Sequence, residues 1–85
     1  MKRRLQIRRA LLQALDDVPD NYLLPQDTLS ADAGRRVLPA PTRSEFEAEL
    51  RRADEDRLVA GITTADEGAK WKITDAGRVW LSERP

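Results

Sequence analysis

Positive charge gathers at the start of the chain, where the first nine residues carry five basic side chains and no acid. Such a cluster could hold the phosphate backbone or a groove of a nucleic acid, so Arg3 and Arg4 are candidate contacts. The pattern is also typical of a frayed, solvated helix start, of a mitochondrial-type presequence or of a membrane-surface helix. We expect residues 1–4 to form a flexible basic arm. The five side chains are those of Lys2, Arg3, Arg4, Arg8 and Arg9.

Residue types that usually carry catalysis are missing from the chain. It has no histidine and no cysteine, which removes imidazole bases, thiolate nucleophiles, disulfides, haem ligation and zinc fingers. A hydrolytic serine would have to pair with lysine, and the chain has three of each. We therefore expect no enzyme, no catalytic residue and no cofactor.

Three consecutive acids, Asp54, Glu55 and Asp56, are the one run that suggests a cation. A calcium loop has alternating oxygen ligands and a central glycine, and this run has neither feature. Acids at the end of a helix oppose the helix dipole and favour a neighbouring arginine. The run therefore predicts a solvated helix end with an arginine partner, and no metal site.

The composition predicts a single, heavily solvated globular domain. Of the 85 residues, 40% are hydrophobic and 35% are charged, which suffices for one core. Fifteen basic and fifteen acidic residues cancel, so any affinity for nucleic acid must come from a local patch. No apolar run approaches the ~20 residues of a membrane span, and arginines interrupt any signal-peptide stretch. We expect one domain over residues 1–85, cytoplasmic and not bound to a membrane.

The first element that would position these side chains is a helix from Lys2 to Val18, where apolar residues recur at steps of three and four. Pro19–Asp20–Asn21 is typical of the turn that ends it. Tyr22–Leu24 is too short for a helix and predicts an extended stub, with Tyr22 half exposed. The inner stripe of the helix comprises Ile7, Ala10, Leu11, Ala14, Leu15 and Val18.

A second, shorter helix is predicted from Pro25, because a proline without an N–H suits the first helical turn. Its thin inner face would consist of Leu29, Ala33 and Val37. Leu38–Pro39–Ala40–Pro41 cannot continue a helix, since two prolines remove donors and hold extended dihedral angles. The chain must turn there.

A third helix is predicted to start at Thr42–Arg43–Ser44–Glu45, which has the S/T-x-x-E form of a capping box. Helical spacing puts Phe46, Leu50 and Ala53 on its inner side, with the stem of Arg57 along the apolar edge. The outward side then carries Ser44, Glu47, Ala48, Arg51, Arg52 and Glu55.

A β-hairpin is predicted after this helix. Leu58 to Thr63 is rich in β-branched residues, and Trp71 and Ile73 alternate with polar neighbours, so both segments have the period of strands. The intervening residues 64–69 are polar and contain a glycine, which suits a flexible hairpin tip.

A closing helix is predicted from Asp75 to about Glu83, with Thr74 as its cap. Ala76, Val79 and Trp80 would turn inward from it. We expect the large aromatic side chains to pack in the core rather than to stack on bases; they are Phe46, Trp71 and Trp80.

This order of elements resembles a winged helix-turn-helix domain of bacterial or phage type. The resemblance is carried by Leu58-Val59-Ala60-Gly61-Ile62 and by Trp71-Lys72-Ile73-Thr74-Asp75-Ala76-Gly77-Arg78 with Leu81. The second segment follows the pattern aromatic-x-aliphatic-Thr-x-x-Gly-x-x-x-Leu, in which the chain leaves the wing. The resemblance covers residues 5 to 83. It implies an α+β fold with a three-helix core, a β-hairpin wing and a C-terminal helix, but fold alone does not carry function.

In such families the third helix enters the major groove of DNA and the wing reaches the neighbouring backbone or minor groove. Arginine can pair bidentately with guanine, and a serine hydroxyl at a helix start can meet phosphate. The resemblance therefore implies nucleic-acid contacts from helix three and from the wing. They are Arg43, Ser44, Glu47 and Arg51, flanked by Ala48, and Thr64, Lys70 and Lys72, flanked by Thr63.

The predicted third helix is more acidic than a dedicated DNA reader usually is. Within residues 45–56 only Arg51 and Arg52 offset the acids, and the hairpin tip adds Asp66 and Glu67. We therefore expect weak binding by a monomer, and stronger binding by a homodimer that contacts two half-sites. The six acids are Glu45, Glu47, Glu49, Asp54, Glu55 and Asp56.

Two hypotheses about function follow from the sequence. The first is a small DNA-binding transcriptional regulator that contacts double-stranded DNA through helix three and the wing. The alternative is a winged-helix adaptor or inhibitor that binds a protein partner through its acidic helix and does not bind DNA.

Overall fold

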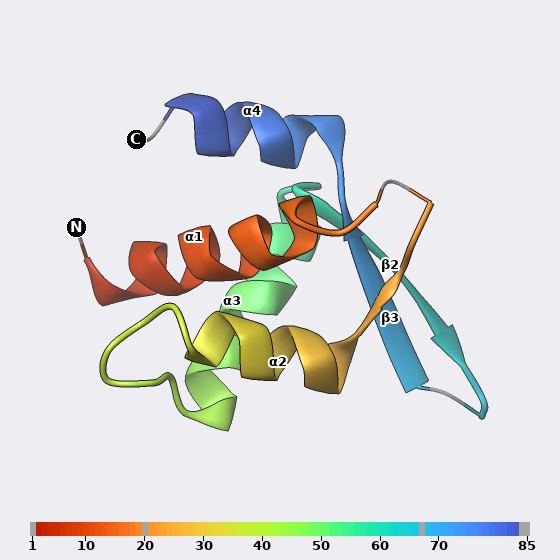
Figure 1. The fold of residues 1–85 in the computed structure, drawn as a ribbon, viewed down its shortest axis with the longest axis horizontal. Helices are drawn as coiled ribbons and strands as arrows, with labels where there is room; N and C mark the ends of the chain where they lie inside the picture. Colours follow the sequence, from red (N-terminus) through yellow and green to blue (C-terminus); the bar gives the residue numbers. More distant parts are fainter. Residues whose placement is uncertain (1, 20, 67, 84–85) are drawn as a thin grey trace.

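The computed structural model describes residues 2–19, 21–66 and 68–83, which form four helices and a three-stranded antiparallel sheet (Figure 1). The α+β class is confirmed, and the arrangement is compatible with a winged-helix layout. The elements, in chain order, are α1 (Arg3–Asp16), β1 (Leu24–Pro25), α2 (Gln26–Gly34), α3 (Arg43–Glu55), β2 (Val59–Thr64), β3 (Gly68–Ile73) and α4 (Asp75–Glu83).

Strand β3 is the middle strand of the sheet, which has the order β1-β3-β2. The predicted stub after α1 becomes β1, which pairs with β3 through Leu24 and Trp71. The predicted hairpin is confirmed, but the expected tip over residues 64–69 is too long, because Thr64 and Gly68 are still paired. Residue Glu67, which we assigned to the tip, lies outside the described residues, as do Met1 and Asp20.

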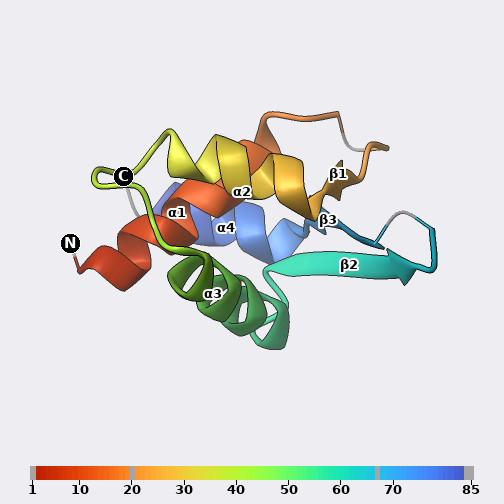
Figure 2. The ribbon, with the colours of Figure 1, turned by 90° about the horizontal axis from the view of Figure 1, so that it is seen from below.

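Helix α1 lies at the centre of the fold and packs against α2, α3, α4 and β3 (Figures 1 and 2). Contact on several sides explains why Leu12, which lies off the predicted stripe, is fully buried. Val18 follows the end of the helix and is only partly buried. The buried apolar residues of α1 are Ile7, Ala10, Leu11, Leu12, Ala14 and Leu15.

Helix α3 begins at the predicted capping box. The Thr42 hydroxyl accepts from the Glu45 amide at 3.1 Å, and the Thr42 amide donates to the Glu45 carboxylate at 3.0 Å. Phe46, Leu50 and Ala53 are buried as expected. These local patterns therefore predicted the start and the inner face of the helix correctly.

The prediction for Arg57 is wrong. Helix α3 ends at Glu55, and Arg57 has a left-handed φ of 62° and is exposed. In this conformation the amides of Arg57 and Leu58 turn back to Asp54 and Ala53, at 3.0 and 2.9 Å. The two bonds satisfy carbonyls at the end of the helix and direct the chain into β2.

Helix α4 is capped as predicted, since the Thr74 hydroxyl accepts from the Gly77 amide at 3.1 Å. The prediction that Ala76 and Val79 turn inward is wrong, because both are exposed. The helix approaches the core through Gly77, which has no side chain to keep it at a distance, and Trp80 follows on the same side, partly buried against the core. The inner face is thus shifted by one residue.

The other aromatic side chains agree with expectation. Phe46 is fully buried, Trp71 is partly buried against the core, and Tyr22 is half exposed. The Trp71 indole N–H donates to the Gln26 side-chain oxygen at 3.1 Å, which ties β3 to the start of α2.

Candidate nucleic-acid interface

Helix α3 is flanked by two separate hollows, which contain some of the predicted contact residues. The first, which we call the α1-side hollow, has a volume of about 300 Å³ and is lined by Arg3, Arg4, Ile7, Ser44, Glu45, Ala48 and Arg52. The second, which we call the β3-side hollow, has a volume of about 230 Å³ and is lined by Gln26, Glu47, Leu50, Arg51, Asp54 and Trp71. Arg3, Arg4 and Ser44 are therefore brought together, while Glu47 and Arg51 belong to the other flank.

Beside the α1-side hollow lies one buried carboxylate, that of Glu49, whose side chain is 1% exposed and whose partners Arg4 and Arg52 line the hollow. It forms ion pairs with the Nε atoms of Arg4 and Arg8, at 2.8 and 3.2 Å, and with Nη1 of Arg52 at 2.8 Å. Arg8 also contacts the Asp56 carboxylate at 3.1 Å, so the predicted arginine partner of the acidic run is confirmed. Three guanidinium groups thus share one buried acid.

Positive charge is in excess at this flank, and part of it is accessible. The side chains of Arg4 and Arg52 are 60% and 46% exposed, although both contact Glu49. Among the ion pairs of the described residues here, three arginines of α1 and Arg52 of α3 share three carboxylates, which leaves a surplus of one positive charge. The guanidinium group has five N–H donors, so an arginine paired with one carboxylate keeps others for a further anion.

Arg3 lines the α1-side hollow and contacts the start of α3. Its Nε donates to the Glu45 carboxylate at 2.7 Å, and its Nη2 donates to the carbonyls of Pro39 and Ala40 at 2.9 and 3.3 Å. The hydrogen bond from Arg3, reinforced by the Thr42 amide, lowers the pKa of Glu45 to about 2, and the same bond raises the pKa of Arg3. Arg3 therefore ties the start of α1 to the start of α3.

The arm expected over residues 1–4 includes Arg3 and Arg4, which lie in the first turn of α1 and have carboxylate partners on α3. The sequence shows an arm with no acid near it along the chain, but the fold supplies the acids from a helix 40 residues further on. Met1 lies outside the described residues.

The β3-side hollow has the opposite charge balance. Glu47 and Asp54 line it with a single arginine, Arg51. Arg43 is highly exposed at the start of α3 and forms an ion pair with Glu47 at 2.8 Å. The acids of α3 therefore interrupt the positive charge on the side of the helix that faces the sheet.

The two lysines predicted for the wing do not face this hollow. Side chains alternate along a strand, so Lys70 and Lys72 project from the face of the sheet opposite to Trp71, which lines the β3-side hollow. The Thr64 hydroxyl donates to the Gly68 carbonyl at 3.4 Å and lies at the end of the hairpin. The wing residues thus form a third group, separate from both flanks of α3.

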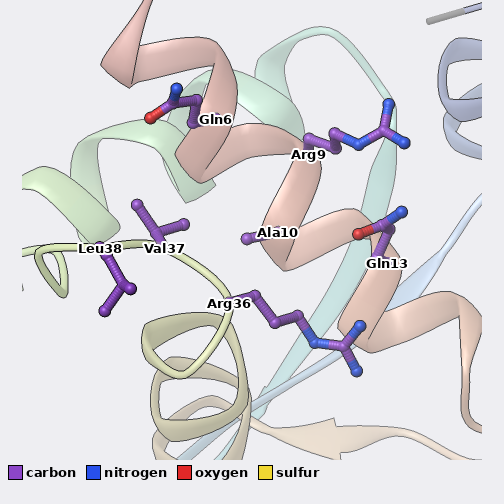
Figure 3. A pocket seen from close by; sticks show the side chains of 7 residues that line it. All are labelled: Gln6, Arg9, Ala10, Gln13, Arg36, Val37 and Leu38. Carbon is purple, nitrogen blue, oxygen red and sulfur yellow. The ribbon is translucent and has the colours of Figure 1, made fainter. Parts of the chain in front are cut away.

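A third hollow, with a volume of about 420 Å³, lies on another side of α1 and was not anticipated from the sequence. Figure 3 shows the extended side chains of Arg9 and Arg36 on either side of Gln13, with Leu38 on the adjoining loop. Arg36 pairs with Asp17 at 2.7 Å, and Leu38 is 90% exposed. The one sequence signal was an isolated leucine within a proline-rich turn.

Within residues 2–19, 21–66 and 68–83, no three acidic side chains are arranged to hold a metal ion. None of the helices in that part of the chain is long and apolar enough to cross a bilayer. Comparison with known protein families, with curated proteins and with solved structures gives no significant match to this chain.

Proposed function

We propose that the protein binds duplex DNA, with the α1-side hollow holding the phosphate backbone and α3 lying against the groove. The proposal takes the fold to be of the winged-helix type, because β1 lies between α1 and α2 in the chain and pairs with a strand of the later hairpin. It depends mainly on one observation, that three guanidinium groups share the single buried carboxylate of Glu49.

The chemistry of the α1-side hollow suits a phosphate group. Glu49 holds Nε of Arg4 and Nη1 of Arg52 in position. Both arginines are exposed enough for their other N–H groups to donate to an anion. Ser44 lies in the same hollow, one residue after the start of α3, and its hydroxyl can donate to a phosphate oxygen. Such contacts would fix the position of α3 on the duplex without recognising its base sequence.

Base recognition would then come from the exposed side of α3. Arg43 and Arg51 are both exposed, and arginine is the side chain that most often pairs with guanine in the major groove. Glu47 contacts Arg43 and restrains it in the absence of DNA. The acids beside Arg51 explain why we propose backbone contacts on the α1 side of the helix rather than on the β3 side.

Affinity of a monomer would be low. Each neutralised phosphate adds about 0.9 to the slope of log affinity against log salt concentration, so contacts from Arg4 and Arg52 give a slope of about 2. A protein that binds tightly makes several such contacts. The proposal therefore predicts weak, salt-sensitive binding that a dimer would strengthen.

The test is a fluorescence anisotropy titration of labelled duplex DNA at low salt. The double variant Arg4→Gln/Arg52→Gln should lose about tenfold in affinity and most of the salt slope. The matched control is Arg35→Gln/Arg57→Gln, which removes two exposed arginines outside the α1-side hollow and should change affinity less than about twofold. Circular dichroism melts verify that each variant is folded.

Two results would reject the proposal. One is the absence of binding by the unaltered protein at high micromolar concentration, and the other is an equal loss of affinity in the control variant. A loss confined to Lys70→Gln/Lys72→Gln would instead assign the contact to the wing.

A second candidate function is binding to a protein partner, and the hollow beside Leu38 favours it. A leucine that is 90% exposed at the rim of a hollow, beside Arg9 and Arg36, combines the apolar and arginine side chains that are common in interfaces. Helix α3 is less suited to this role than its sequence suggests, since Glu45, Glu49 and Asp56 are paired with α1. Leu38→Asp separates the two candidates, because it should abolish crosslinking to a protein partner and leave duplex affinity unchanged.

A further inference from the structure

We infer that β2 is the surface through which two copies of this chain associate, as an antiparallel β2–β2 pair that joins their sheets. In the described part of the chain, β2 has β3 as its only strand neighbour, so its other edge has unpaired backbone groups. An edge strand of this kind is a template for a further strand. The inference does not depend on DNA binding.

The composition of β2 supports pairing, because nothing along it blocks the edge. Its six residues, Val59–Thr64, include no charge and no proline, in a chain of which 35% is charged. Charged side chains and proline are the usual means by which proteins protect an edge strand from association. Gly61, Ile62 and Thr63 are exposed, and Ile62 retains 52% of its surface.

The partner that fits this edge is a second β2. The other edge of the sheet is β1, which has two residues, one of them Pro25, and a proline lacks the N–H that a ladder needs. A β2–β1 contact between copies would therefore be short and incomplete. Pairing β2 with itself is two-fold symmetric, so it closes as a dimer and does not propagate into a fibre.

The register follows from the alternation of side chains. Residues directly opposite one another in an antiparallel pair lie on the same face, so the two-fold axis must pass through a residue position and not between two. An axis at Ile62 pairs this side chain with its copy, pairs Gly61 with Thr63 and pairs Ala60 with Thr64. It buries the most exposed apolar side chain of the strand against its equivalent.

The surroundings of Ile62 are compatible with this arrangement. Ile62 lies opposite Lys70 within the hairpin, so the dimer would present Lys70, Ile62, Ile62 and Lys70 in adjacent strands. The two lysines are then separated by three strand spacings, about 14 Å, which is beyond the range of strong repulsion at physiological salt. Their aliphatic stems can cover the isoleucine pair.

Sedimentation equilibrium of the whole chain tests the inference. The unaltered protein should show a monomer–dimer equilibrium at micromolar concentrations, and Ile62→Lys should raise the dissociation constant more than about tenfold, because it sets two charges opposite each other at the axis. The matched control is Val79→Lys on α4, because the Val79 side chain is similarly exposed, at 54%. This variant should dimerise like the unaltered protein.

A second variant tests the register. The chain has no cysteine, so Ile62→Cys introduces a single thiol. Under mild oxidation it should form a disulfide-linked dimer much faster than Val79→Cys does, since the axis brings the two copies of residue 62 together. A protein that stays monomeric up to about 1 mM, higher oligomers in place of a dimer, or equal crosslinking at the two positions would overturn the inference.

Discussion

Arg8 of α1 and Glu49 of α3 form an ion pair inside the protein. The Arg8 Nε donates to the Glu49 carboxylate at 3.2 Å, and the two side chains are only 9% and 1% exposed. In the sequence these residues belong to a basic segment and to an acidic helix that look like two independent surfaces. In the fold they neutralise each other across the α1–α3 contact.

The Glu49 carboxylate should be essential to stability. Glu49→Gln keeps the shape of the side chain but leaves the nearly buried guanidinium of Arg8 with Asp56 as its remaining acid partner. Removing one partner of a buried ion pair costs 3–5 kcal/mol, and because Asp56 remains we expect the free energy of unfolding to fall by about 3 kcal/mol. Urea denaturation at pH 7 measures this.

The control for that measurement is Glu55→Gln, which removes an exposed acid from the same helix. It should change the free energy of unfolding by less than about 0.5 kcal/mol. A loss below about 1 kcal/mol for Glu49→Gln would contradict the role that we assign to the buried pair.

The contact between Arg3 and Glu45 should make stability depend on acid pH. The Arg3 side chain, with the Thr42 amide, lowers the pKa of Glu45 to about 2 from an ordinary value of 4.5. A lowered carboxylate pKa stabilises the folded state above pH 4.5, and this stabilisation is lost as the pH falls from 4.5 toward 2. The difference in unfolding free energy between the unaltered protein and Glu45→Gln should therefore shrink over that range.

Carboxyl carbon NMR gives a direct measurement of the same contact. The titration midpoint of the Glu45 resonance should lie at about pH 2 in the unaltered protein. It should lie closer to pH 4.5 in Arg3→Gln, which lacks the guanidinium. If the midpoint is the same in both proteins, Arg3 does not hold Glu45 in solution.

Gly77 should tolerate no side chain, although it lies within a helix. Helix propensity alone favours alanine over glycine by about 1 kcal/mol. A Cβ atom at Gly77 would overlap the Leu58 carbonyl oxygen and come within 2.6 Å of Cγ1 of Ile73. We expect Gly77→Ala to lower the free energy of unfolding by about 2 kcal/mol, because α4 must move away from the core.

Gly34, at the end of α2, is the matched control for this substitution. A Cβ atom there would have no neighbour within 4 Å, so Gly34→Ala should be neutral or stabilise the protein by about 0.5 kcal/mol. Thermal unfolding of both variants decides the matter. Equal effects at the two positions would show that the close approach at Gly77 is not tight.

Local patterns predicted much of this fold. The capping box at Thr42 and Glu45 formed as expected, since both partners lie within one helical turn. Phe46, Leu50 and Ala53 are buried because helical spacing alone sets them on one face. The hairpin and the cap at Thr74 depend likewise on residues close together in the chain.

The candidate site could not be predicted in the same way, because it depends on contacts between distant segments. Nothing near Glu49 in the chain marks it as buried, and its partner Arg8 lies 41 residues away. Similarly, Gly77 defines the inner face of α4 through its contact with Leu58, so Val79 was wrongly expected to face the core.

The order of the residues specified the helices, their caps and the hairpin, since backbone hydrogen bonding and side-chain periodicity are local. The packing of α1 against α3 specified which charges cancel and which stay exposed, since electrostatic interactions depend on distance in space and on burial.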